Sequence, residues 1–371
     1  MKKVGIITLH GIHNYGSFMQ AYGTQVAVER CGYKAEIINY RYPNKFHNQE
    51  KTLKSKLLHV VNVVFKDIFL LGKNYKLNKN YNDCFKQFYH LSKSYSTHDA
   101  IYNNPPHYDI YLTGSDQIWR YTFSKGDGVF FMDFAPQGSK IISFSSSFGR
   151  IFLNDFYKEK YAKWLLRFQH LSVREPSGID IIASLTGQKA TCTIDPSFIL
   201  TKEEWSNIAV KPKTKNKYIF IYGFGGEYIE NIAKKIQAMT GYDIIRTNGN
   251  FLDYFRKDIH YILDAGPKEW LGYIQNAEMV FAGSFHGTAL SITFNRPFIA
   301  VLNEEENHNF RQLNILELLN LDTNKIKIGQ ENININSIMN IMQNINWEQV
   351  NTLLEENRSL AMHYLKNALD N

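Results

Sequence analysis

The sequence predicts an α/β protein made of two doubly wound, Rossmann-like domains, with a set of closing helices at the C-terminal end. Three observations support this fold class. The chain opens with a strand pattern at residues 4–9, a helical pattern at 15–30 and a second strand pattern at 34–40, which together make a βαβ unit. Strands and helices alternate again from residue 218 onward. Most of the unusual polar residues stand directly after predicted strands, where open α/β sheets bind their ligands.

The composition is that of a globular protein with two domains. A chain of 371 residues is longer than one ordinary domain, and 44% of its residues are hydrophobic while 21% are charged. Aromatic residues reach 14%, which supplies core area and surfaces on which sugars or bases can stack. The net charge of +7 permits an anionic partner such as phosphate, an acidic glycan, nucleic acid or anionic lipid, but it selects none of them.

Cysteine usage and the N-terminus predict a soluble, cytoplasmic protein. The three cysteines are far apart, odd in number and outside any zinc-ligand spacing, which argues against a disulfide framework and a structural metal. The short apolar run at the start is typical of a first strand, because a signal peptide needs a longer apolar region and a cleavage site. Nor is there a stretch of roughly 18 uninterrupted apolar residues that would predict a membrane span.

The first domain is expected over residues 1–206. Its later strands are expected at 109–113, 140–144, 170–173 and 189–194, with helices at 155–169 and 176–185.

Residues 44–105 form a Lys-, Asn- and Tyr-rich insertion in the first domain. Within it, residues 53–71 predict a basic amphipathic helix whose polar side carries Lys54, Lys56 and Lys66. Such a helix could lie on a membrane surface or act as a lid. It could equally pack on its own domain, since any surface helix is amphipathic, and this second interpretation is the favoured one.

The second domain is expected over residues 218–330, after a basic, proline-containing linker at 207–217. Residues 331–371 are expected to form the closing helices. The glycine-rich turn at 223–226 lacks the G-x-G-x-x-G pattern of a dinucleotide site, so it is predicted to be a plain turn. Other strands are expected at 218–222, 242–246, 279–282 and 298–302, with helices at 227–239 and 268–277.

The pattern of residues 280–302 predicts a strand, a tight turn, a helix, a second turn and a second strand. Ser284 suits the N-cap of that helix, and His286 then lies in its first turn at the positive end of the helix dipole. A helix start with free N–H groups and a histidine suits an anion. A buried helix start with a packed histidine explains the same pattern, and the local sequence leaves both interpretations open.

The polar residues after the predicted strands are the candidates for chemistry. Arginine can pair bidentately with phosphate or carboxylate, and histidine can exchange a proton near neutral pH. Each residue taken singly also has a structural explanation, such as a helix cap, a surface ion pair or a turn. The nucleophile elbow, P-loop, HExxH and kinase motifs are absent. The candidates are Asn14, Ser115, Asp116, Ser145, Ser146, Ser147, Arg174, Glu175, Asp195, Ser284 and His286.

Around these residues the chain resembles the polysaccharide pyruvyl transferases. No single segment is specific, but six of them in the family's order are, and they span most of residues 1–320. The segments are NYGS at 14–17, GSDQIW at 114–119, SFSSSFG at 143–149, LSVRE at 171–175, TIDPS at 193–197, and SFHG at 284–287 leading to RPF at 296–298.

The resemblance implies a GT-B-like pair of α/β domains that face a cleft. It also implies transfer of a pyruvyl group from phosphoenolpyruvate to two hydroxyls of a sugar, which forms a cyclic ketal and releases phosphate. The acceptor would be a capsule or exopolysaccharide, or a precursor that could be lipid-linked at the inner face of the membrane. Phosphoenolpyruvate would be the donor substrate, and neither a separate cofactor, a metal nor nucleic acid is implied.

By the same resemblance, His286 matches the family's essential histidine and Arg174 its donor-binding arginine. Together with Asp116 they form the expected catalytic set. His286 could protonate C3 of the donor or bind its phosphate, and Asp116 or Glu175 could take the hydroxyl proton. The expected donor-binding residues are Asn14, Gly16, Ser17, Arg174, Ser284, Phe285 and His286. The expected acceptor-binding residues are Ser115, Asp116, Gln117, Trp119 and Glu175.

The chain departs from the family's pattern at three places. Ser17 stands where some branches carry an acid, and Asn309 stands where many relatives carry an arginine, with Arg311 as a candidate replacement. The insertion at 44–105 lies outside the resemblance and is a candidate acceptor-specific element. Two other functions remain open: a GT-B glycosyltransferase that uses a nucleotide sugar, and a non-catalytic glycan-binding protein.

Overall fold

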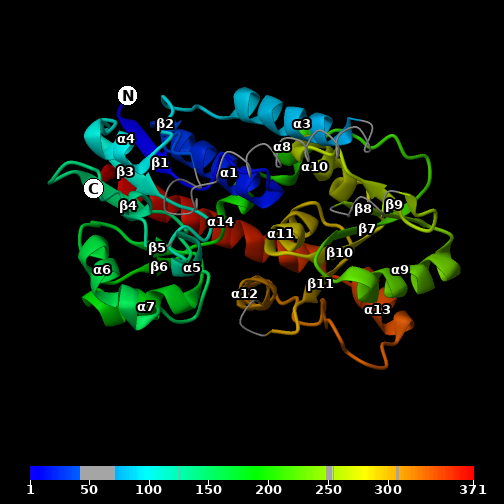
Figure 1. Ribbon diagram of the computed structural model, residues 1–371. Coiled ribbons are helices and arrows are strands. Elements are labelled where there is room, and N and C mark those ends of the chain that lie inside the picture. Colours follow the sequence, from blue (N-terminus) through cyan, green and yellow to red (C-terminus); the bar gives the residue numbers. More distant parts are fainter. Residues whose placement is uncertain (42–71, 125, 248–252, 254, 306–308) are drawn as a thin grey trace. The chain divides into compact units, whose positions relative to one another are not determined.

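A computed structural model describes residues 1–41, 72–124, 126–247, 253, 255–305 and 309–371. The chain forms two compact units (Figure 1). Of the described residues, the first unit comprises 1–41, 85–200 and 355–371, and the second comprises 72–84 together with those from 201 to 354. The basic helix expected at 53–71 lies outside the described residues.

The first unit is built on a parallel sheet with the strand order β2-β1-β3-β4. Isolated parallel bridges connect the segment after β4 to a short pair, β5 and β6, so the parallel arrangement continues beyond the four-stranded sheet. Strands β1, β3, β4 and β5 are almost entirely buried, as the apolar runs predict, whereas β2 is partly exposed and β6 is exposed. The strands are β1 (Lys3–Ile7), β2 (Lys34–Ile37), β3 (Ile110–Thr113), β4 (Lys140–Ser143), β5 (Ser172–Val173) and β6 (Thr191–Cys192).

Helix α1 (Tyr15–Arg30) begins where the sequence predicts, because the side chain of Asn14 accepts a hydrogen bond from the backbone N–H of Ser17. It packs very closely on the 3₁₀ turn η2 (Pro196–Phe198): a Cβ added at Gly23 would stand 2.1 Å from the carbonyl oxygen of Pro196. The other helical segments of this unit are α4 (His98–Asn103), α5 (Tyr121–Ser124), η1 (Gly128–Phe131), α6 (Asp155–Leu165) and α7 (Pro176–Thr186).

The second unit contains a six-stranded parallel sheet with the order β12-β11-β10-β7-β8-β9. Counted from β7, this is the Rossmann order 3-2-1-4-5-6. The short edge strands β9 and β12 were not among the expected elements. The strands are β7 (Tyr218–Gly223), β8 (Asp243–Thr247), β9 (His260–Ile262), β10 (Met279–Gly283), β11 (Phe298–Leu302) and β12 (Lys325–Lys327).

The helices of the second unit include α8 (Lys202–Ile208), which the expected range of 1–206 assigned to the first domain. A capping box of Thr201 and Glu204 starts α8, and the helix packs against α10 (Pro267–Gln275). Its other helices are α9 (Gly226–Thr240), α11 (Phe285–Thr293), α12 (Phe310–Leu318) and α13 (Ile335–Gln343), while α14 (Trp347–Asp370) begins in the second unit and ends in the first.

The expected linker at 207–217 is in contact with α10. The backbone N–H of Val210 donates to the carbonyl of Lys268 at 2.9 Å. A Cβ at Gly272 would stand 1.8 Å from the carbonyl oxygen of Val210, so only glycine permits this approach. The boundary between the units therefore falls before α8.

The described end of the insertion also belongs partly to the second unit. Helix α3 (Lys73–Phe88) begins in that unit, where Lys76 Nζ lies 2.8 Å from the carboxylate of Asp264. Asn80 donates to the backbone carbonyl of Asp264 at 2.9 Å. Within the part of the chain that the structure describes, no helix is both long enough and apolar enough to cross a membrane.

Each of the two larger sheets has one point at which the strand order reverses. In the first unit it lies between β1 and β3, and in the second between β7 and β10. Loops that leave neighbouring strands in opposite directions open a crevice there, and ligands of doubly wound sheets bind in it. These two switch points carry most of the residues that the sequence singled out.

Candidate functional site

At the switch point of the first unit, side chains of α1 tie the loops after β1 and β3 together. Ser17 Oγ donates to Asp116 Oδ2 at 3.0 Å. Gln20, one helical turn further, accepts from the hydroxyl of Thr8 at 3.0 Å and from the backbone N–H of Ser115 at 3.1 Å. Gln20 was not among the predicted residues, although its spacing of three from Ser17 puts both on one face of the helix.

The loop after β3 has an unusual backbone that holds Asp116 in place. Asp116 has a φ of 68° and Ser145, in the loop after β4, has a φ of 51°. Non-glycine residues rarely adopt positive φ, and such residues cluster at functional sites. Gly114 is required beside them, since a Cβ there would stand 2.0 Å from the carbonyl oxygen of Phe144. Asp116 Oδ1 accepts from the N–H of Gln117 at 2.8 Å.

Arg174 lies at the end of β5 and is enclosed by carboxylates. Its Nε donates to Glu175 Oε1 at 3.0 Å and its Nη1 to Asp195 Oδ2 at 2.7 Å, and only 2% of the side chain is exposed. Burial alone would lower the pKa of Arg174, but the negative charges of Glu175, Asp195 and Asp116 outweigh it and raise the pKa. Arg174 was predicted to bind the donor substrate, but its charge is already balanced by carboxylates within the unit.

Buried hydroxyls complete this network. Ser115 Oγ donates to the carbonyl of Ser145 at 2.7 Å and to Asp195 Oδ2 at 3.2 Å. Ser147 Oγ donates to Glu175 Oε1 at 2.7 Å. Each carboxylate that faces Arg174 thus receives a further hydrogen bond, which is what a buried ion pair requires.

Two of the predicted acceptor contacts are fully buried. Trp119 has no exposed surface: its Nε1 donates to the carbonyl of Phe130 at 3.1 Å and its ring stacks on Phe131 at 5.3 Å between centroids. Ser115 is equally buried. Both residues support the loop after β3 from the core side, whereas the half-buried Gln117 of the same predicted set retains some exposed surface.

At the switch point of the second unit, the chain passes from β10 into α11 as the sequence predicts. Ser284 is the N-cap, and its Oγ accepts from the N–H of Gly287 at 3.1 Å, which confirms the predicted cap. His286 is the second residue of α11, is 8% exposed, and packs edge-to-face with Phe285 at 5.1 Å. A small part of His286 thus faces outward at the positive end of the helix dipole.

Close packing fixes the start of α11. A Cβ at Gly283 would stand 2.2 Å from the carbonyl oxygen of Phe224, and one at Gly287 would stand 2.9 Å from the ring of Tyr222. From α12, Gln312 Nε2 donates to the carbonyl of Ala282 and to Thr288 Oγ1, each at 3.1 Å. These contacts hold the strand, the turn and the first helical turn as one rigid piece.

Asn309 occupies the position where the resemblance led us to expect an arginine. It is 2% exposed, accepts from the N–H of Asn303 at 2.7 Å, and donates to the carbonyl of the same residue at 2.8 Å. The hydrogen bonds of Asn309 therefore join the segment after β11 to the start of α12, which is a structural role.

The glycine-rich turn between β7 and α9 is held by an arginine. Arg246 Nη1 and Nη2 donate to the carbonyls of Gly226 and Gly223 at 3.1 and 3.3 Å. Glu230 balances this arginine and also pairs with Arg256 at 2.8 Å. Burial would raise the pKa of Glu230, but hydrogen bonds from Tyr261 and Arg256 and the nearby positive charges lower it. A cavity of about 460 Å³ is bordered by Gly226, Glu230, Arg246, Arg256 and Tyr261.

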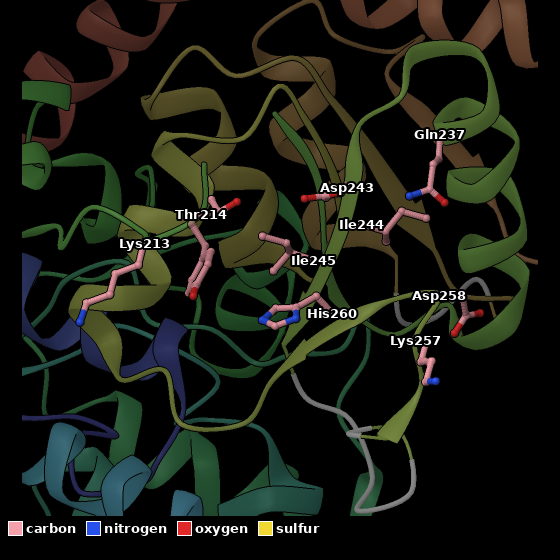
Figure 2. Close-up of a pocket in the computed structure, with 10 residues that line it drawn as sticks. Lys213, Thr214, Gln237, Asp243, Ile244, Ile245, Lys257, Asp258 and His260 are labelled. Carbon is pink, nitrogen blue, oxygen red and sulfur yellow. The ribbon is translucent and has the colours of Figure 1, made fainter. Parts of the chain in front are cut away.

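A second cavity of about 510 Å³ lies elsewhere in this unit and contains none of the predicted site residues. Figure 2 shows Ile245 and His260 on neighbouring strands, with Lys213 and Thr214 from the segment before β7. It is lined by Lys213, Thr214, Gln237, Asp243, Ile244, Ile245, Lys257, Asp258, His260 and Tyr273.

Comparison with solved structures finds the same fold in two-domain α/β proteins. Arabidopsis thaliana UGT89C1, solved in complex with UDP-L-rhamnose, is 10% identical with a TM-score of 0.53, over 99% of this chain and 98% of that chain. The UDP-N-acetylglucosamine 2-epimerase of Rickettsia bellii is 9% identical with a TM-score of 0.53, over 100% and 96%. At such low identity these likenesses show the fold alone, and they confirm the predicted GT-B-type class of two Rossmann-like units.

Comparison at the level of sequence gives the family. A search of curated proteins finds no match. The family profile described as polysaccharide pyruvyl transferase matches residues 14–305, a range that holds every segment on which the resemblance was based. Because this match covers most of the 371 residues, the chain belongs to the polysaccharide pyruvyl transferase family.

Proposed function

We propose that the protein transfers a pyruvyl group from phosphoenolpyruvate to two hydroxyls of one sugar in a cell-surface polysaccharide or its precursor. Membership of the family supports a transferase. The observation that carries the finer proposal is the position of His286, in the first turn of α11 at the switch point of a Rossmann-ordered sheet. A helix N-terminus and a histidine suit a donor that bears both phosphate and carboxylate.

The chemistry balances without an added cofactor. C3 of phosphoenolpyruvate takes up a proton and becomes a methyl group, and C2 gains oxocarbenium character. One sugar hydroxyl adds to C2, the bond from C2 to the phosphate oxygen breaks, and the second hydroxyl closes the ketal. Of the two hydroxyl protons released, one balances the proton taken up by C3 and the other leaves on phosphate.

In this proposal His286 acts on the donor, and Asp116 takes the proton of the attacking hydroxyl. Asp116 is 8% exposed and is oriented by Ser17 and the N–H of Gln117. Arg174 and Glu175 act as positioning residues, since their charges are satisfied by each other and by Asp195. Asn14, Gly16 and Ser17 form the start of α1 and remain proposed donor contacts, as do Ser284 and Phe285.

The test is to incubate the protein with phosphoenolpyruvate and candidate glycans and to measure phosphate release and ketal formation. We expect phosphate release that depends on the acceptor, and His286→Ala to abolish it. His363→Ala is the matched control, because His363 is exposed and lies outside the range 14–305 that matches the family. Stabilisation of the protein by a nucleotide sugar but not by phosphoenolpyruvate would contradict the proposal.

The two candidate roles of His286 differ in their kinetics. If His286 protonates C3, His286→Gln lowers kcat and leaves KM for phosphoenolpyruvate nearly unchanged, because the interaction is made in the transition state. If it binds phosphate, the same change raises KM. A glycosyltransferase remains the second candidate, because the fold is shared with UGT89C1, and it predicts nucleotide release from a nucleotide sugar under the same conditions.

A further inference from the structure

Two arginines that the family segments do not include lie at the carboxyl ends of neighbouring strands in the first unit. Arg120 follows the segment after β3, and Arg150 follows the segment after β4. The two segments run side by side: the N–H of Trp119 donates to the carbonyl of Ser147 at 3.2 Å, and the N–H of Ser147 donates to the carbonyl of Asp116 at 3.0 Å. Both arginines therefore start from the same edge of the sheet as Asp116.

Gly149 brings the two arginines together. It has a φ of 62°, and a Cβ added to it would stand 3.0 Å from Cδ of Arg120 and 2.5 Å from Oε1 of Gln117. The peptide that carries Arg150 thus lies directly against the side chain of Arg120. Only a residue without a Cβ allows this approach, so the geometry of the pair depends on Gly149.

The hydrogen bonds described for Arg120 go to uncharged side chains. Arg120 Nε donates to the hydroxyl of Thr122 at 2.7 Å, and Arg120 Nη1 donates to Gln117 Oε1 at 3.0 Å. Arg150 makes no hydrogen bond or ion pair with any residue that the structure describes, and its Nε is buried. Burial and the positive charge of Arg150 both lower the pKa of Arg120.

This arrangement is the reverse of that around Arg174. Arg174 has two carboxylates within hydrogen-bonding distance, whereas Arg120 donates to two uncharged side chains and is exposed to the positive charge of Arg150. A buried donor without a partner and a repulsive pair of charges both raise the free energy of the protein without a bound anion. An anion that accepts from both guanidinium groups would remove both penalties.

We propose that Arg120 and Arg150 bind an oxyanion of the substrate, a phosphate or a carboxylate group, at the edge of the first unit that carries Asp116. The planar forks of two arginines match the oxygens of either group. This inference rests on the proposed function only for the identity of the substrate. Two molecules can supply this oxyanion: phosphoenolpyruvate, or an acceptor in which a phosphate joins the sugar to its carrier.

The test is the affinity for inorganic phosphate, measured by titration calorimetry at constant ionic strength. Arg150→Gln is the informative variant, because Arg150 has no described partner whose loss would unfold the protein. We expect it to raise the Kd for phosphate about tenfold or more, and Arg150→Lys to raise it less because lysine keeps the charge but not the fork. Arg41→Gln is the matched control, since Arg41 is exposed, and it should leave the Kd unchanged.

Phosphate could also bind at the start of α11, so His286→Ala is titrated in parallel. The proposal is overturned if the wild-type protein does not bind phosphate, or if Arg150→Gln binds it as tightly as the wild type does. The proposal is also overturned if Arg41→Gln and Arg150→Gln weaken phosphate binding equally, because an equal loss of affinity is a general effect of net charge.

Displacement experiments then separate the two sources. Phosphoenolpyruvate or glucose 1-phosphate is titrated against bound phosphate in the wild-type and Arg150→Gln proteins. The substrate that competes in the wild type and loses affinity in the variant is the one held by the pair, and competition by neither overturns the proposal. Phosphate binding needs no turnover, so failure of pyruvyl transfer leaves this inference standing, and normal phosphate binding by Arg150→Gln refutes the pair while leaving the transferase intact.

Discussion

Arg174→Met should destabilise the first unit strongly, whatever it does to catalysis. The change removes the positive charge that faces Glu175 and Asp195, and methionine fills much of the same space. The side chains of these two acids are 3% and 0% exposed, so water cannot replace the hydrogen bonds that each carboxylate receives from Arg174. Two buried negative charges would then stand near Asp116 without a cation between them.

The expected size follows from this burial. Removal of one partner of a buried ion pair typically costs about 3–5 kcal/mol. In a unit of this size each kcal/mol lowers Tm by about 2–4 °C, so Tm should fall by at least about 6–12 °C. Arg41→Met removes the same charge from an exposed position and should change stability by at most about 0.5 kcal/mol.

The assay is urea unfolding followed by circular dichroism, with the double variant Arg174→Met/Asp195→Asn as the decisive comparison. Asparagine keeps the oxygen that accepts from the N–H of Ser197 but carries no charge. We expect it to restore part of the lost stability, with a coupling energy of about 0.5–3 kcal/mol. An Arg174→Met protein that is as stable as wild type but no longer binds phosphoenolpyruvate would refute this reasoning and return Arg174 to the donor site.

Three further predictions test other parts of the molecule. His286→Ala should lose pyruvyl transfer while Tm in differential scanning calorimetry falls by about 2–4 °C, because a typical single substitution costs about 1 kcal/mol. A much larger fall in Tm would make the buried His286 a packing residue. The attachment of α14 to the first unit should weaken at alkaline pH: burial raises the pKa of Cys31 to about 11 and of Tyr33 to about 12, from ordinary values of 9.0 and 10.0. Raised pKa values favour the neutral forms in the folded state, so this contribution is complete below pH 9.0 and is lost between 9.0 and about 12. Hydrogen exchange of α14 should therefore accelerate over that window and less so in Tyr33→Phe. Finally, the protein should not co-sediment with anionic lipid vesicles if residues 53–71 pack on their own domain. Vesicle binding that weakens with added salt, and when the lysines of this stretch are changed to glutamate, would favour membrane contact.

Much of the fold was readable from the sequence because its signals are local. Asn14 and Ser284 each accept a hydrogen bond from an N–H three residues ahead, so the starts of α1 and α11 are encoded within a single turn of helix. The parallel strands are apolar runs bounded by glycine and polar residues. The order of the family segments along the chain was likewise visible, and the match over residues 14–305 confirms the family.

Tertiary structure decided which of the predicted site residues are buried and which partners their charged groups contact. Arg174 is paired with an acid 21 residues away, and Ser17 is bonded to one 99 residues away, so neither partner could be read from neighbouring positions. The burial of Trp119 and the approach of Arg150 to Arg120 at Gly149 also depend on how separate loops meet. Caps, periodicity and motif order arise from interactions within a few residues, whereas the partner of a charge depends on strand order and loop packing, which bring distant parts of the chain together.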